Sequence, residues 1–291
     1  MTETPTLQIE LIVPPMKRNP SRLRILCLFA ICTAAHSLAL ANTATWIGVS
    51  GASVTTNWSD NLNWTNSAGG SPGFTNNDVV FGNAGAVGTD NTINSAVDVT
   101  GQALSMTFTN QSSQFHTISI GPGIILTNNN GLNVGSATGI DANNTKVNFT
   151  GGGTLVQRGN TTVRNNCNTS GSTSLATLDL SGLSYFISGS NATFNVGGTG
   201  GETRSAGQLV LAVVSNNITV GTLNFQTTSG NGGNNGGANI RLGAGTNIIN
   251  AGTINIVAIR AVSLDPRVPD AEAIRRPSDP IEAGVKSHDF H

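Results

Sequence analysis

The residues that could carry chemistry in this chain are few, and they lie far apart in the sequence. The carboxylates between residues 42 and 264 are Asp60, Asp78, Asp90, Asp98, Asp141, Asp179 and Glu202. Glycoside hydrolysis needs two carboxylates that face each other across the scissile bond, and no pair here repeats at a spacing that indicates one site. Lys146, Arg158 and Arg164 are the candidate bases of a polysaccharide lyase, but a lone basic residue on a strand is usually solvated. The sequence predicts no catalytic site.

Histidine and glycine patterns add no further chemistry. His116 is the only histidine between residue 42 and residue 286, and its context "SSQFHTISI" contains no nucleophile elbow for acyl transfer. The glycine-rich run 229–243 has Asn where a calcium-binding nonapeptide repeat has Asp, and it contains no carboxylate. Neutral amides bind cations weakly, so we expect neither a metal nor a cofactor.

All three tryptophans of the chain, Trp46, Trp58 and Trp64, fall in one polar stretch. Aromatic rings can stack on sugars, and Asp60 and Asn63 beside them could bond hydroxyl groups, so one interpretation is a glycan-binding module. The other is a cap over 42–85, in which these bulky rings close the first unit of a repetitive fold. The glycan interpretation predicts exposed rings, and the cap predicts buried ones.

The elements that would position these residues are short strands. An aliphatic residue, one intervening residue, a second large apolar residue and then a turn recur along the body of the chain. Such alternation places side chains on opposite faces of a strand. The units are 118–121, 132–135, 147–151, 178–182, 194–198, 218–221, 240–243 and 254–256.

The repeated unit predicts an all-β protein, a parallel β-helix or solenoid over 86–260 with a Trp-rich N-terminal cap. Gly- and Asn-rich turns, short similar strands and one recurring motif favour the solenoid, because Asn tolerates left-handed backbone angles and its amide can bond along a stack. A β-sandwich is the alternative. An uncovered solenoid end is prone to pairing, so self-association through open ends is expected.

The two ends of the chain differ from its body. Residues 1–41 contain a basic start at Met16, an apolar run, and Ala39 and Ala41 at small positions, which predicts a secretory signal cleaved after Ala41. The apolar run is short for a transmembrane anchor, so no membrane span is expected in the mature chain. Residues 261–291 are charged and contain proline, which indicates a linker, a disordered tail or non-native sequence after a truncated gene.

The composition of the body limits the partners of the protein. The 14 Lys and Arg and 15 Asp and Glu residues are concentrated in 1–24 and 265–291, and the net charge is −1. This balance offers no basic stripe for nucleic acid. Cys167 is the single cysteine after the signal, so no internal disulfide is predicted.

The opening stretch resembles exported bacterial surface proteins of the autotransporter-associated β-strand repeat and PEP-CTERM-like type. The resemblance rests on Trp46, Trp58, Asn63-Trp64, Pro72 and the "DVVFGN" of 78–83, and further along the chain on the run 238–256. It covers about 42–260 and marks an N-terminal fragment of such a protein. It implies a secreted β-helical passenger on the outer surface of a Gram-negative bacterium, with a structural or adhesive role and with extracellular glycans or cell-surface components as partners.

Overall fold

The computed structural model describes eight stretches of the chain. These are residues 42–48, 55–66, 77–136, 143–166, 174–189, 192–198, 205–226 and 237–257. The predicted signal segment, its cleavage residues Ala39 and Ala41, and the tail 261–291 lie outside them. Within these stretches the one helical element is a short 3-10 turn, η1 (Asn61–Asn63), and every other regular element is a strand.

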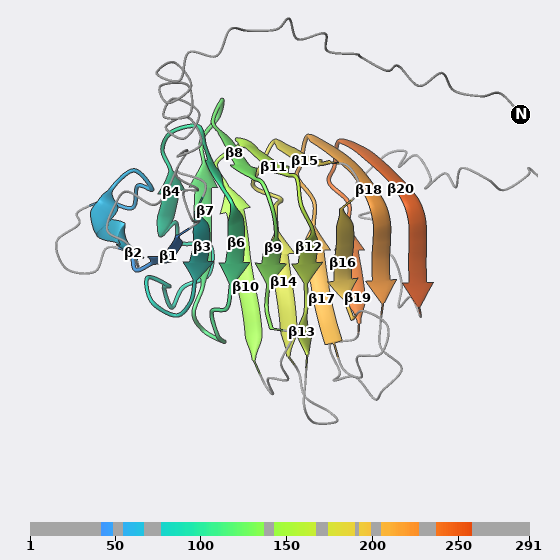
Figure 1. Cartoon of the computed structure of the whole chain (residues 1–291), viewed down its shortest axis with the longest axis horizontal. Helices are drawn as coiled ribbons and strands as arrows, with labels where there is room; N and C mark the ends of the chain where they lie inside the picture. Colours follow the sequence, from blue (N-terminus) through green and yellow to red (C-terminus); the bar gives the residue numbers. More distant parts are fainter. Residues whose placement is uncertain are drawn as a thin grey trace, which may run out of the picture. The chain divides into compact units, whose positions relative to one another are not determined.

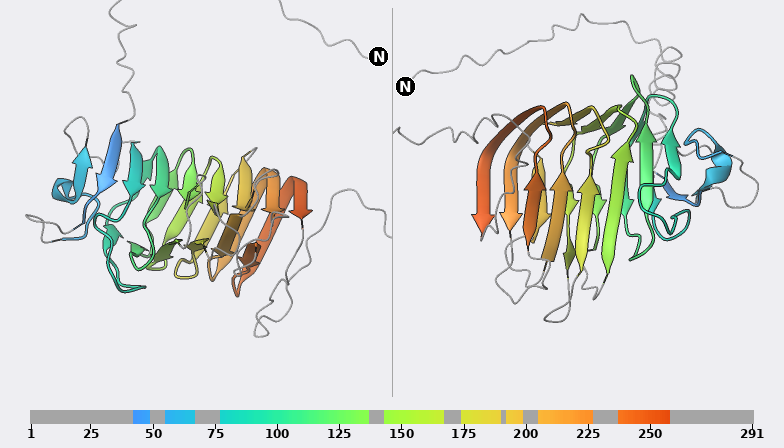
Figure 2. Two further views of the ribbon diagram at one scale, coloured as in Figure 1. Left: turned by 90° about the horizontal axis from the view of Figure 1, so that it is seen from below. Right: turned by 180° about the vertical axis from the view of Figure 1, so that it is seen from behind.

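The strands stack into a parallel β-solenoid, as the sequence predicts, and not into a β-sandwich. Each coil contributes a strand, or part of a long strand, to each of three faces, which we call A, B and C in chain order. In Figures 1 and 2 the sequence colours run in order along the stack, so consecutive coils are neighbours in space. The pairings between consecutive coils are parallel in all three faces.

Face A is the seven-stranded sheet. Its members are β4 (Ser95–Val97), β7 (His116–Ile120), β10 (Asn144–Thr150), β14 (Leu175–Asp179), β17 (Ser205–Val210) and β19 (Ala238–Arg241), with β13 (Asn165–Asn166) antiparallel to β17.

Faces B and C belong to one thirteen-stranded sheet. Face B contains β5 (Gly101–Ala103), β8 (Ile125–Asn128), β11 (Thr154–Gln157) and β15 (Tyr185–Ser188). Face C contains β3 (Asp78–Phe81), β6 (Ser105–Phe108), β9 (Leu132–Val134), β12 (Thr161–Val163) and β16 (Thr193–Gly197). The 12-residue strands β18 (Ser215–Gln226) and β20 (Thr246–Val257) pass from face B into face C and join the two.

The core is built from columns of inward side chains, because alternate residues of each strand point into the coil. On face C, consecutive coils pair Met106 with Leu132, Leu132 with Thr161, and Phe194 with Leu223. All of these side chains are buried. A single coil cannot bury its apolar residues alone, so the column is buried only when several coils stack.

Polar ladders also run inside and outside the stack. On the inner side of face B, Asn128 Nδ2 donates to Gln157 Oε1 at 2.7 Å, and both residues are fully buried. In the later coils Asn216 Nδ2 donates to Asn247 Oδ1 at 2.9 Å across a separation of 31 residues. The amides therefore bond along the stack as the Asn-rich turns predict, and one full coil of the later repeats spans about 31 residues.

The stretch before the first coil forms the end of the stack. Strand β1 (Thr43–Trp46) pairs in parallel with β3, and β2 (Trp64–Asn66) pairs antiparallel with β1. The antiparallel strand breaks the repeating pattern at this end, and the Trp-rich cap predicted for the solenoid lies here. Figure 1 shows β1 and β2 at the blue end of the stack.

Candidate functional site

The three tryptophans, proposed as a sugar-stacking platform, come together in the interior of the cap. Trp46 and Trp58 have no exposed surface, and Trp64 is 6% exposed. Trp64 lies edge-on to both other rings, with centroids 4.9 Å from Trp46 and 5.3 Å from Trp58. Phe81 of β3 packs against all three rings. The rings offer no open face to a sugar in this structure, and their burial is the arrangement that the cap interpretation predicts.

The polar residues of the same segment are used to hold its backbone. Trp58 Nε1 donates to Ser95 Oγ at 2.6 Å, and Trp64 Nε1 donates to the Trp58 carbonyl at 3.0 Å. Asp60 caps η1 by accepting from the Leu62 N–H at 3.0 Å. The buried Asn63 amide donates to two carbonyls of the preceding loop. Asp60 and Asn63 therefore bond protein groups where the glycan interpretation would have them bond hydroxyls.

The carboxylates that the structure describes each bond a different local partner. Asp78 accepts from Ser105, Asp98 from Ser59, and Asp179 from Ser181. Within the described residues, no hydrogen bond links two of these carboxylates. Asp141 and Glu202 lie outside those residues.

Lys146, a candidate lyase base, forms an ion pair with Asp90 from the loop that precedes β4. Partial burial alone would raise the pKa of Asp90, but hydrogen bonds from Lys146 and Asn148, the charge of Lys146 and the Asn91 N–H together lower it below its usual value. The Lys146 amine, the candidate base, is thus already paired with the Asp90 carboxylate.

His116, the first residue of β7 on face A, is buried next to the cap. Its Nε2 donates to the Gly82 carbonyl at 2.7 Å, and its Nδ1 lies 3.3 Å from the Asn94 amide nitrogen. The ring meets Phe81 edge-on at 5.2 Å. Burial lowers its pKa from 6.5 to about 4, against the opposing effect of the Gly82 carbonyl.

The described stretches contain neither a metal-ligand cluster nor a membrane-spanning helix. There, no group of three or more His, Cys, Asp or Glu side chains gathers around a common point. No helix in those stretches is long and apolar enough to cross a bilayer. Cys167 lies outside them.

The outer side of face C carries rows of small neutral polar groups. Asn224 Nδ2 donates to Asn195 Oδ1 at 2.6 Å, and Asn255 Nδ2 donates to Asn224 Oδ1 at 2.8 Å. A second row, Thr193, Thr222 and Thr253, runs beside this amide ladder in the same register. Because each amide holds the next, the row is rigid along the stack.

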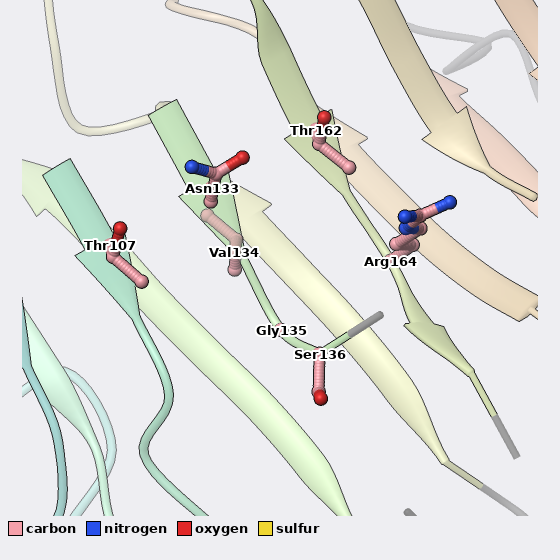
Figure 3. A pocket seen from close by; sticks show the side chains of 7 residues that line it. All are labelled: Thr107, Asn133, Val134, Gly135, Ser136, Thr162 and Arg164. Carbon is pink, nitrogen blue, oxygen red and sulfur yellow. The ribbon is translucent and has the colours of Figure 1, made fainter. Parts of the chain in front are cut away.

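Face C also has a shallow hollow of about 230 Å³ over β6, β9 and β12. Thr107, Asn133 and Thr162 point outward from three neighbouring strands, and Arg164 and Ser136 lie at the side (Figure 3). Gly135 follows β9 with φ +94°, and a Cβ there would lie 2.1 Å from the Arg164 carbonyl oxygen, so only glycine allows the close strand approach. The lining can donate and accept hydrogen bonds, but it contains no acid–base pair.

Face B presents an outward row that no motif in the sequence indicates. The row consists of Ile125, Thr154, Tyr185, Ser215 and Thr246, which are paired in register from β8 to β20. We call it the Tyr185 row. Tyr185 is 46% exposed. The residues next to Tyr185 in the sequence, "SGLS" before it and Phe186 after it, form no recognisable binding motif. Only the strand register places Thr154 and Ser215 on either side of the ring.

Comparison with known proteins gives no match, whether to a family model, a curated protein or a solved structure. The resemblance to repeat-containing surface passengers therefore stays a prediction from the motifs.

Proposed function

We propose that this chain is an exported bacterial surface passenger of the autotransporter-associated repeat or PEP-CTERM-like type, with a structural or adhesive role. The observation that supports this most is the near absence of charge on the strands of two faces. The strands of face B contain no Asp, Glu, Lys or Arg, and within the strands of face C the one charged residue is Asp78. Such faces make contact through hydroxyl, amide and apolar groups and not through charge.

The solenoid gives these faces the rigidity that a contact surface needs. Every coil is bonded to the next along three faces, and amide ladders tie the coils both inside the stack and on its surface. A surface fixed in this way loses little conformational entropy when it binds. Many weak contacts along one repetitive face can then add to firm attachment.

An adhesion assay with beads coated with the full chain tests this proposal. We expect retention on bacterial or plant cell-wall material above albumin-coated beads, and little change between about 0.05 M and 0.5 M salt, because neutral contacts are not screened. Retention that disappears at the higher salt would contradict a neutral contact face. Release of reducing or unsaturated sugar ends by the protein would contradict the non-enzymatic role.

A further inference from the structure

Tyr185 is the one exposed aromatic ring among the described residues, and the other large aromatic side chains there are buried or half-buried. It lies in the middle of face B, with coils on both sides. An aromatic ring that stays exposed on a rigid sheet keeps apolar surface that is not buried when the protein folds. Unlike the three tryptophans, this ring can receive a ligand without any rearrangement of the core.

The neighbours of Tyr185 supply both hydroxyl groups and apolar surface. Thr154 and Ser215 are its register partners on the adjacent strands, so their hydroxyls flank the ring at about the 4.8 Å spacing of paired strands. Ile187, two residues further along β15 and 41% exposed, lies on the same outward side. Its register partner Asn217 is exposed, which adds an amide to this cluster.

The chemistry of this cluster selects the class of ligand. None of the face B strands carries a charged side chain, and the exposed Arg158 that follows β11 already donates to Asn129 Oδ1 at 3.2 Å, so the strands themselves offer a charged polymer no ion pair. A pyranose ring has an apolar C–H face that stacks on an aromatic ring and a rim of hydroxyls that bond hydroxyl and amide side chains. A protein partner would need a much larger apolar patch for stable association.

We propose that face B around Tyr185 is a binding site for a neutral polysaccharide, with one sugar stacked on Tyr185 and its hydroxyls bonded to Thr154, Ser215 and Asn217. The chain of sugars runs along the Tyr185 row and crosses successive coils. This site rests on the proposed adhesive function and names its ligand class. It moves glycan recognition from the buried tryptophans to a different face of the molecule.

Isothermal titration calorimetry of the full chain tests the site, with soluble mixed-linkage β-glucan, arabinoxylan and galactomannan as neutral probes and polygalacturonate as the charged one. We expect at least one neutral polymer to bind. Tyr185→Ala should weaken that binding about tenfold or more, while Tyr185→Phe, which keeps the ring, should stay within about threefold of the parent. Val213→Ala, an exposed apolar truncation outside the row, is the matched control and should bind like the parent.

Three results would overturn the site: no neutral polymer binds the parent chain, only polygalacturonate binds, or Tyr185→Ala binds as tightly as Val213→Ala. The bead assay separates these failures from failure of the adhesive function. Beads that carry Tyr185→Ala and adhere as well as the parent leave adhesion intact and remove this site. Parent beads that do not adhere remove the adhesive function itself. Circular dichroism of each variant confirms that the fold is kept.

Discussion

The two ends of the described stack differ in how fully their inward apolar side chains are buried. At the N-terminal end, β1, β2 and the tryptophan cluster cover the first coil, and Phe81 beneath them is fully buried. At the other end, β19 and β20 are the last strands described, and their inward residues are only half-buried. Leu209, Ile218 and Leu223 are buried, whereas their register partners one coil later, Ile240, Ile249 and Ile254, are intermediate.

The difference shows what a cap contributes to a repetitive fold. An inward side chain is fully buried only when another layer lies beyond it, so the same apolar residue contributes less stability in the last described coil than in an inner coil. The cap supplies that layer with three large aromatic side chains and an antiparallel strand. We therefore expect substitutions in the cap to lower the free energy of unfolding the most. Matched substitutions in the last described coil should lower it the least.

Loss of a cap ring should have the largest effect. Trp58→Ala removes a fully buried ring and leaves Ser95 Oγ without its 2.6 Å donor, so we expect a loss of about 3–5 kcal/mol in the free energy of unfolding. Urea denaturation followed by circular dichroism measures it. Trp58→Phe should recover part of the loss. A cost below about 1 kcal/mol for the alanine variant would show that the ring does not support the first coil.

A matched pair of isoleucines compares an inner coil with the last one. Ile218 and Ile249 are register partners, but Ile218 is 1% exposed and Ile249 is half-buried. Ile218→Ala should cost about 2–5 kcal/mol, and Ile249→Ala about half of that or less, because less burial is lost. Equal costs in urea denaturation would mean that the last described coil is covered as fully as the inner one.

Acid should weaken the capped end through His116. Its folded pKa of about 4 lies below the ordinary 6.5, so between these values the unfolded chain binds a proton that the folded chain excludes. The stabilisation is present above pH 6.5 and is lost as the pH falls towards 4, with a limit of about 3 kcal/mol. Denaturation midpoints across this range measure it. His116→Gln should flatten the slope, and a variant with an unchanged slope would assign the dependence to other groups.

Self-association should be the smallest of these effects. The last described strand, β20, exposes Ile248 at 46% and Ile256 at 40%, and within the described residues no strand pairs with its outer edge. Such an edge favours pairing with another copy. Light scattering should show concentration-dependent growth in mass, reduced by Ile248→Lys and unaffected by Ile93→Lys at the far end of the stack. A monodisperse monomer for the parent chain would contradict it.

Much of the fold could be predicted from the alternation of apolar residues. All eight recurring units lie on strands or at their ends, from Ile118 in β7 to Ile256 in β20. These units came from faces A and C or from the long strands, where inward residues are apolar. The face B strands β8, β11 and β15 were missed because Asn128, Gln157 and Ser188 occupy inward positions, which breaks the apolar alternation.

The spacing and the sites were harder to predict than the strands. Most consecutive units lie on different faces, so the distances between them along the sequence are irregular, while the later coils repeat at about 31 residues along any one face. Likewise, the sequence shows three clustered tryptophans, but it does not show whether they are exposed or buried. That exposure decides between a binding site and a cap. Tyr185 became a candidate only through its partners on adjacent strands, which no local motif reveals.

Tryptophan fluorescence of the full chain, with iodide quenching, tests the capped solenoid most directly, because all three tryptophans of the sequence lie in the cap. We predict blue-shifted emission that iodide quenches poorly, and no change in it when a neutral polysaccharide is added at a concentration that saturates the Tyr185 face. Red-shifted, readily quenched emission that shifts saturably with the polysaccharide would contradict the account, since the rings would then be an exposed binding site and not the cover of the first coil.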